Sequence, residues 1–200
     1  MRSDANPRDP VARALSLMEL FCSLPEAGEF RSRMPSEVPE PERSLLDHRS
    51  HMTVAMERFH GTEVRLRVVA CLAETPGPTA GWYAREILLE SLSGDVIQYG
   101  IVRIDLTTLD DTTARAIRAA RQPLGRILID AGVLRDVHSV SLLEVTPGPH
   151  LESLFHMNQT SSTPRHLYGR VADILLNDRA AVELLEIVAP FSRDEQALDS

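Results

Sequence analysis

An alternating pattern of side chains predicts a strand at residues 81–90, and one charge breaks that pattern. One face of the strand carries Tyr83, Arg85, Ile87 and Leu89, since successive side chains of a strand point to opposite faces. Arg85 therefore stands on an otherwise apolar face. A guanidinium in such surroundings needs a partner. This strand must therefore pack so that Arg85 meets a partner, either within the protein or in a binding site.

A complementary anomaly occurs near the other end of the chain, at residues 181–188. Glu186 interrupts an apolar row made of Val182, Leu184 and Val188. Two interpretations fit this opposite pair of charges. In the first, Arg85 and Glu186 form a buried ion pair with no further role. In the second, both line a dry pocket, where Arg85 holds a substrate carboxylate and Glu186 meets a hydroxyl or a transferable proton.

The composition fits one globular domain, because 200 residues with 43% hydrophobic content can enclose a small ligand. A net charge of −8, with no Lys/Arg-rich block, argues against general binding to nucleic acid or to an anionic membrane.

We expect Cys22 and Cys71 to be free thiols. The charged start of the chain fits neither a signal peptide nor a membrane span, so we expect a cytoplasmic protein.

Helix and turn signals organise the rest of the chain. Asp9-Pro10 opens a helix that should end near Leu24, and a Pro/Glu-rich surface connection or mobile segment follows to Pro41. A second helix is predicted for residues 41–59, with a break at 50–53 as the alternative. Further helices are expected at residues 107–121, after Pro123 and near 151–157, and strands at 64–68, 82–90, 96–106, 138–145, 167–176 and 180–188.

This order of elements predicts an α+β domain with an antiparallel sheet covered largely on one side. The domain plan is an N-terminal helix and connection at residues 1–40 that pack on the main domain, the domain itself at 41–190, and a tail at 191–200. His48, His51 and His60 lack the spacing of a metal site, so no metal is expected.

Four motifs in order resemble those of the chorismate pyruvate-lyase family, and the similarity runs from Leu45 to Pro190. The motifs are Trp82–Leu89, Pro123–Leu128, Tyr168–Arg170 and Glu186–Pro190. The resemblance implies a six-stranded antiparallel sheet with helices on one face and a ligand sealed beneath helical flaps. It also implies conversion of chorismate to 4-hydroxybenzoate and pyruvate, without metal or organic cofactor.

The resemblance also implies roles for individual residues. The ligand-holding arginine of the family falls on Arg85, and its pocket carboxylate falls on Glu186, so both are the expected catalytic residues. Main-chain groups at Leu124 and Met52, together with Arg170 of the third motif, are expected to bind substrate. Formation of an aromatic ring drives this reaction. Such a protein therefore needs mainly to bind and orient the substrate and to transfer one proton.

The chain also departs from that family. It carries the extra N-terminal segment, a longer stretch from Ser139 to Pro164, and Arg103 at an apolar position of the family strand. One alternative is therefore a related protein that acts on or binds a different small carboxylated ring in specialised metabolism. Another is a non-catalytic effector-binding module like those of certain transcription regulators. Against the latter, the residues before Leu45 are too few and too proline-rich for a DNA-binding helix-turn-helix.

Overall fold

The computed structural model describes residues 9–73, 82–133, 135–157 and 166–191. They form one antiparallel sheet of seven strands in the order β1-β5-β6-β7-β4-β3-β2. The strands are β1 (Gly28–Arg33), β2 (Arg65–Leu72), β3 (Trp82–Glu90), β4 (Val96–Asp105), β5 (Arg135–Pro147), β6 (Leu167–Leu176) and β7 (Arg179–Val188). The α-helices are α1 (Pro10–Met18), α2 (Leu24–Ala27), α3 (Glu42–Leu46), α4 (Met52–His60), α5 (Asp111–Ala119), α6 (Leu124–Asp130) and α7 (Pro149–Leu154), with 3₁₀ turns at Pro35–Glu37 and Leu106–Thr108.

Tight hairpins set the register of the strands that carry the predicted site. The turn between β6 and β7 uses Asn177 and Asp178, both with positive φ, at 50° and 64°. Two such residues match the right-handed twist of the flanking strands. A second hairpin joins β3 to β4, with the turn at Ser91–Asp95 between them. These turns join β3 to β4 and β6 to β7, and the long-range pairing of β4 with β7 then places the four strands side by side.

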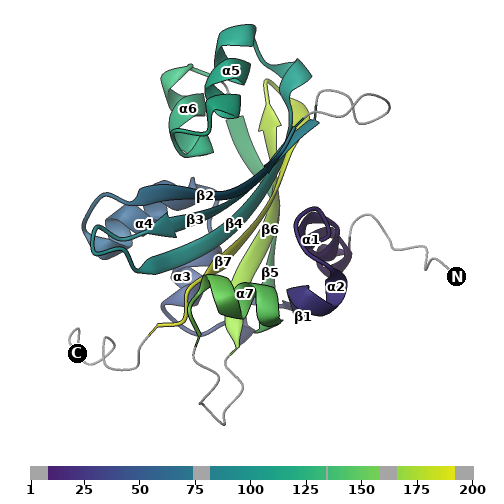
Figure 1. The fold of residues 1–200 in the computed structure, drawn as a ribbon, viewed down its shortest axis with the longest axis vertical. Helices are drawn as coiled ribbons and strands as arrows, with labels where there is room; N and C mark the ends of the chain where they lie inside the picture. The colour runs from purple at the N-terminus through teal and green to yellow at the C-terminus, as the bar shows by residue number, and fades with distance from the viewer. Residues whose placement is uncertain (1–8, 74–81, 134, 158–165, 192–200) are drawn as a thin grey trace, which may run out of the picture.

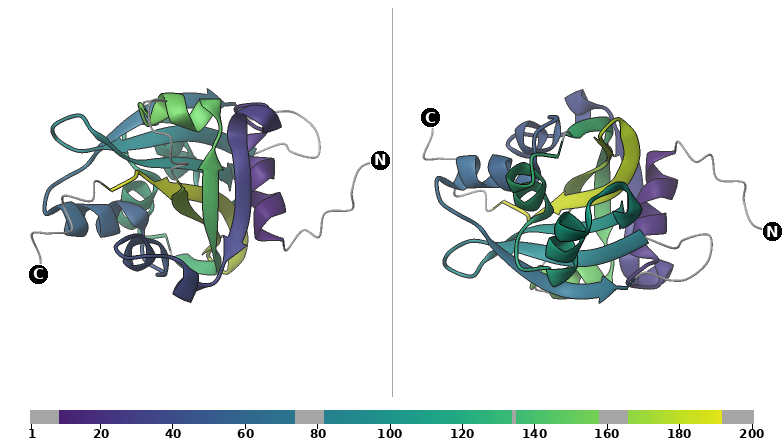
Figure 2. Two further views of the ribbon diagram at one scale, coloured as in Figure 1. Left: turned by 90° about the horizontal axis from the view of Figure 1, so that it is seen from below. Right: turned by 90° about the horizontal axis from the view of Figure 1, so that it is seen from above.

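Helices cover both faces of the sheet, which corrects the prediction that they lie on one face (Figures 1 and 2). The face that bears Arg85 and Glu186 packs against α3, α4, α5 and α6. The opposite face packs against α1 and α7, through residues such as Leu17 and Leu151. Each face of this sheet is rich in apolar side chains, so each must be covered.

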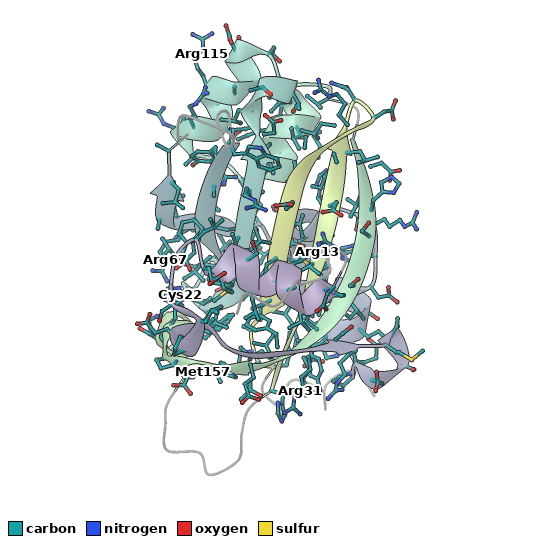
Figure 3. The ribbon with its side chains drawn as sticks, turned by 90° about the vertical axis from the view of Figure 1, so that its right-hand side faces the viewer. Arg13, Cys22, Arg31, Arg67, Arg115 and Met157 are labelled. Atoms are coloured by element: carbon teal, nitrogen blue, oxygen red, sulfur yellow. The ribbon has the colours of Figure 1, made fainter. Side chains whose placement is uncertain are left out.

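Helix α1 is the main cover of that opposite face, as Figure 3 shows. Asp9 caps its N-terminus, since the carboxylate accepts the Val11 N–H at 3.1 Å. Its buried side chains, Ala14, Leu17 and Met18, join the core under β4 and β7. The helix ends at Met18 rather than near Leu24, and a turn leads into α2.

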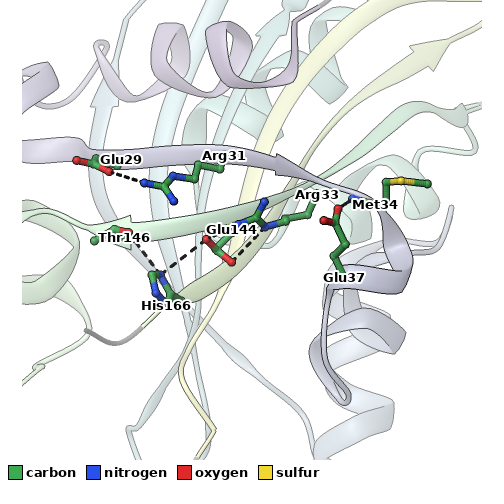
Figure 4. Close-up of polar contacts among 8 residues, drawn as sticks. All are labelled: Glu29, Arg31, Arg33, Met34, Glu37, Glu144, Thr146 and His166. Atoms are coloured by element: carbon green, nitrogen blue, oxygen red, sulfur yellow. Dashed lines mark hydrogen bonds and ion pairs between the residues drawn. The ribbon is translucent and has the colours of Figure 1, made fainter. Parts of the chain in front are cut away.

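Strand β1 is the element that the sequence did not predict, and it makes the sheet seven strands instead of six. Residues 28–33 pair with β5, within the stretch predicted to be a surface connection. Gly28 is required at the start, because its φ is +96° and a Cβ there would lie 2.2 Å from the Thr146 carbonyl oxygen. Arg33 Nη2 also binds Glu144 at 2.9 Å (Figure 4). Only Phe30 of this edge strand is buried, so the apolar alternation that marks a strand is missing.

The predicted second helix is broken, as the alternative interpretation allowed. It forms α3 and α4, separated by a connector at residues 47–51. Gly61 ends α4 in the left-handed conformation with φ of 66°. The break turns the N-terminus of α4 toward the sheet, and this geometry creates the cavity described next.

Candidate functional site

A cavity of about 70 Å³ lies between the sheet and the first residues of α4 and α6. Its floor consists of alternate residues of β3, β4 and β7, and His51, Met52, Pro123 and Leu124 stand around it. Arg85 and Glu186 both line it, so the two charges that interrupt apolar rows converge on one enclosure. Met52 and Leu124 line it as well. Among the sequence-predicted site residues only Arg170 lies outside the lining.

Arg85 is buried in the cavity wall with much of its hydrogen-bonding capacity unused. The residue is 1% exposed. Its Nη2 donates to the Gln122 carbonyl oxygen at 3.2 Å. Its Nε and Nη1 are buried and have no hydrogen-bond partner among the described residues. Burial lowers the pKa of this guanidinium, which nevertheless remains charged. The result is a cation ready to accept an anionic occupant.

Glu186 is paired, but its partner is Arg170 rather than Arg85. On the sheet, Glu186 stands between Gly100 of β4 and Arg170 of β6. Arg170 Nε donates to its Oε2 at 2.7 Å. A buried Arg85–Glu186 ion pair, the first of the two interpretations, is therefore not what forms.

Arg170 organises the connector between α3 and α4 instead of facing the cavity. Besides Glu186, its guanidinium donates to the carbonyl oxygens of Leu46, His48 and Ser50, at 3.2, 2.7 and 3.3 Å. These bonds use the donors of a fully buried side chain, 1% exposed. The connector leads directly to His51 and Met52, so Arg170 fixes the entry of α4 into the cavity wall.

The start of α4 adds free main-chain donors to the wall. The first hydrogen bond of the helix runs from Ala55 N to His51 O at 3.2 Å, and the His51 side chain provides no cap. The N–H groups of residues 52–54 therefore lie outside the helical ladder. Gly125 of α6 packs against the His51 ring, since a Cβ there would approach it to 2.9 Å. That contact holds α6 against the start of α4 beside the cavity.

Gln98 is a lining residue that the sequence reasoning missed. It is 1% exposed, and its Oε1 is buried without a hydrogen-bond donor in the part of the chain that is described. Period-two alternation along β4 places it on the face of Gly100 and Val102, which is the signal that was available. A neutral amide does not interrupt an apolar row as visibly as a charge does.

A second buried polar cluster lies on the opposite face of the sheet. Glu86, 1% exposed, accepts from Tyr99 Oη at 2.7 Å, and its Oε1 is 2.6 Å from His150 Nε2. Burial, followed by the charge of Glu86, raises the pKa of Tyr99 well above its usual value. These contacts attach α7 to β3 and β4, so the cluster serves packing between elements.

Metal binding and membrane spanning are two further properties that the described residues address. Within the described ranges, no group of three or more His, Cys, Asp or Glu side chains could hold a metal ion. None of the described helices combines the length and apolar character needed to span a membrane.

The comparison with solved structures identifies the fold. PhnF from Mycobacterium smegmatis matches with a TM-score of 0.51 and 14% identity over 70% of this chain and 64% of PhnF. The effector domain of that PhnF matches with a TM-score of 0.47 and 13% identity, over 70% and 88% of the two chains. A GntR-family transcriptional regulator from Bacillus cereus gives 0.44 and 10%, over 66% and 96%. The chorismate lyase-like α+β fold predicted from the motifs is therefore confirmed.

Sequence comparisons give no family assignment. No protein-family model matches the chain, and no curated protein matches it. The matched region spans 64% of PhnF, so the likeness covers part of that protein.

The prediction of a lyase is wrong. PhnF, whose structure matches with a TM-score above 0.5, is not described as a lyase. The site offers a physical reason as well. Glu186, the carboxylate expected to meet a hydroxyl or a transferable proton, is held by Arg170 in an ion pair, and the other donors of Arg170 bind carbonyl oxygens around the connector.

Proposed function

We propose that this chain is a non-catalytic binding module for a small anionic molecule, whose acid group is held by Arg85. One observation carries the proposal: Arg85 lines a cavity, and two nitrogens of its fully buried guanidinium lack a partner among the described residues. A buried charge without a counter-ion is costly, so natural proteins seldom keep one without a use. A carboxylate or a phosphate is the group that guanidinium N–H donors bind best.

The walls of the cavity support an anion in the same place. The N–H groups at the start of α4 point outward from the helical ladder, and the positive end of the helix dipole lies there. Helix α4 has nine residues, and its first residues, Met52 and Thr53, line the cavity beside Arg85. Guanidinium and amide donors would then share the oxygens of one acid group.

The size of the cavity sets a second expectation. A volume of about 70 Å³ is below the few hundred Å³ that is usual for ligand pockets. A ligand larger than a few heavy atoms therefore requires α4 and α6 to separate at the contact between His51 and Gly125. Binding would be coupled to movement of these helices, which is what an effector module requires. The effector domain of PhnF supports a sensing role for the shared fold.

A binding screen tests this function. Calorimetry and thermal-shift measurements on small carboxylates, phosphate monoesters and their neutral amide or alcohol counterparts should detect acids alone. Arg85→Met should lose at least tenfold in affinity for those acids, because a charge-assisted hydrogen bond contributes about 1.5–3 kcal/mol. Arg126→Met, which removes a half-exposed arginine of α6, is the matched control and should bind normally.

Two outcomes would contradict the proposal. One is equal binding of acids to wild type and Arg85→Met. The other is a bound acid that is recovered chemically changed, which would indicate turnover; NMR of the recovered ligand distinguishes this case.

A further inference from the structure

Gln98 is the second buried polar side chain that the cavity leaves unsatisfied. It lines the cavity, is 1% exposed, and its Oε1 has no donor within the described residues. Its Nε2 lies 3.6 Å from the position that a Cβ on Gly100 would take, so the side chain turns along β4 toward the cavity floor. Keeping a buried amide oxygen unpaired is unfavourable, and a ligand donor would remove that penalty.

The polar residues of the cavity floor lie in successive rows, where a row is a set of residues paired across neighbouring strands. Arg85 stands opposite Val102, Glu186 stands opposite Gly100, and Gln98 lies one row further along β4. Rows on the same face are two residues apart, or about 7 Å. The Gln98 amide turns back to the row of Gly100, so a ligand whose acid group is at Arg85 reaches the amide across about one row, beside the Glu186 carboxylate.

The charges in the cavity determine what the rest of the ligand can be. Arg170 balances Glu186 through the 2.7 Å ion pair, so this carboxylate brings no free negative charge. Arg85 has no acidic partner among the described residues and leaves one positive charge. A ligand with one negative charge neutralises the cavity, whereas a zwitterion leaves the positive charge unbalanced in a site of low polarity.

We propose that the site selects small monoanionic acids that also carry a neutral hydrogen-bond donor, a hydroxyl or an amide N–H, and that Gln98 accepts from this donor. The inference rests on the proposed function, since the acid group is the one held by Arg85. An apolar acid leaves Gln98 Oε1 unpaired. An ammonium group adds a second positive charge to a cavity in which the charge of Arg85 already needs the acid group to balance it.

Unfolding of the ligand-free protein gives a first test. Gln98→Met keeps the length of the side chain and removes the amide, and Leu185→Met, at a fully buried residue of β7 on the opposite face of the sheet, is the control. Gln98→Met should shift the urea midpoint upward, because a residue retained for binding leaves the free protein less stable. A midpoint below that of Leu185→Met would show that the amide is structural and would overturn the inference.

Binding of three matched acids gives the second test. Propionate, 3-hydroxypropionate and β-alanine differ in having no donor, a neutral donor or a charged one. Wild type should bind 3-hydroxypropionate about fivefold more tightly than propionate, and β-alanine no more tightly than propionate. Gln98→Met should bind the first two equally, and Leu185→Met should keep the preference. A wild type without the preference, or a preference that survives in Gln98→Met, overturns the inference.

Arg85→Met separates the two proposals. If propionate binding depends on Arg85 while the hydroxyl gives no advantage, the anion-binding function stands and only the role of Gln98 fails. If none of the three acids binds to wild type, or all bind equally to Arg85→Met, both proposals fail.

Discussion

Arg85 and Arg170 are both fully buried on the same face of the sheet, yet their surroundings differ. Arg170 has a carboxylate and three carbonyl oxygens around it. Arg85 has one carbonyl oxygen and two nitrogens without partners in the described part of the chain. The first arginine contributes to the folded structure, and the second is suited to a ligand. Stability measurements can separate these roles.

We expect opposite effects from replacing the two arginines. Arg170→Met should lower the free energy of unfolding by about 3–5 kcal/mol, because it leaves Glu186 and the connector carbonyls without their donor. Arg85→Met should change it by less than about 1 kcal/mol or increase it, because an unpaired buried charge is removed. Urea unfolding followed by circular dichroism measures both. Similar losses in the two variants would mean that Arg85 is structural.

Cys22 provides a residue-scale test of the electrostatics on the opposite face of the sheet. Burial, and then the charge of Glu86, raises the pKa of its thiol to about 11. At pH 8 only on the order of one molecule in a thousand then carries the reactive thiolate. We expect iodoacetamide at pH 8 to modify the exposed Cys71 first and to spare Cys22. Mass spectrometry of peptides reports the order, and faster labelling of Cys22 would contradict it. Glu86→Gln should increase labelling at Cys22.

At the scale of elements, the connector between α3 and α4 depends on a neutral histidine. His48 Nδ1 lies 3.2 Å from Arg170 Nη1 and accepts from Ser50 N at 3.2 Å, so this nitrogen must be unprotonated. Burial first, and then the positive charge of Arg170, lower the pKa of His48. The ring therefore resists protonation in the folded state more than in the unfolded chain.

The direction of this pKa shift predicts a loss of stability in acid. Above the unfolded value, about 6.5, neither state is protonated at His48. Below it the unfolded chain takes up a proton that the folded protein resists, so the free energy of unfolding falls as pH decreases. His48→Gln should flatten the decrease between pH 7.5 and 5.5, measured by urea unfolding. His138→Gln, at a histidine whose side chain is 41% exposed, is the control, and equal slopes in both variants would refute the assignment.

On the scale of the whole molecule, the fold is a sheet with helices on both faces. Helix α1 comes from the start of the chain and covers β4, β6 and β7, which come from its middle and end. Long-range packing of this kind makes the N-terminal segment part of the core. Figure 3 shows α1 lying across the strands.

Shortening one buried side chain of α1 tests this packing. Leu17, 2% exposed, lies in the core beneath the helix, so Leu17→Ala should cost about 2–5 kcal/mol through lost burial and a cavity. Leu24→Ala, at a side chain that is 42% exposed, should cost less than about 0.5 kcal/mol. Thermal and urea unfolding of the two variants provide the comparison. Equal stabilities would show that α1 is not part of the cooperative unit.

The shared cavity position of Arg85 and Glu186 could be predicted because strand periodicity is local. Alternation assigns each side chain to a face, and hairpin turns bring neighbouring strands together in antiparallel order. Strand β1 could not be predicted in this way, since five of its six side chains lack the burial that produces the pattern. The sequence shows that the face opposite Arg85 is apolar, but it does not show which helix covers that face.

The amino-acid sequence alone determined the strands, their turns and the face on which each charge lies, because these depend on neighbours a few residues apart. Only the tertiary structure decided that Glu186 pairs with Arg170, that Arg85 keeps unused donors, and that Gln98 lies beside them. Those outcomes depend on register across four strands and on helices far away in the chain. Hydrogen-bond partners lie within about 3 Å of each other, a distance that only the assembled fold defines.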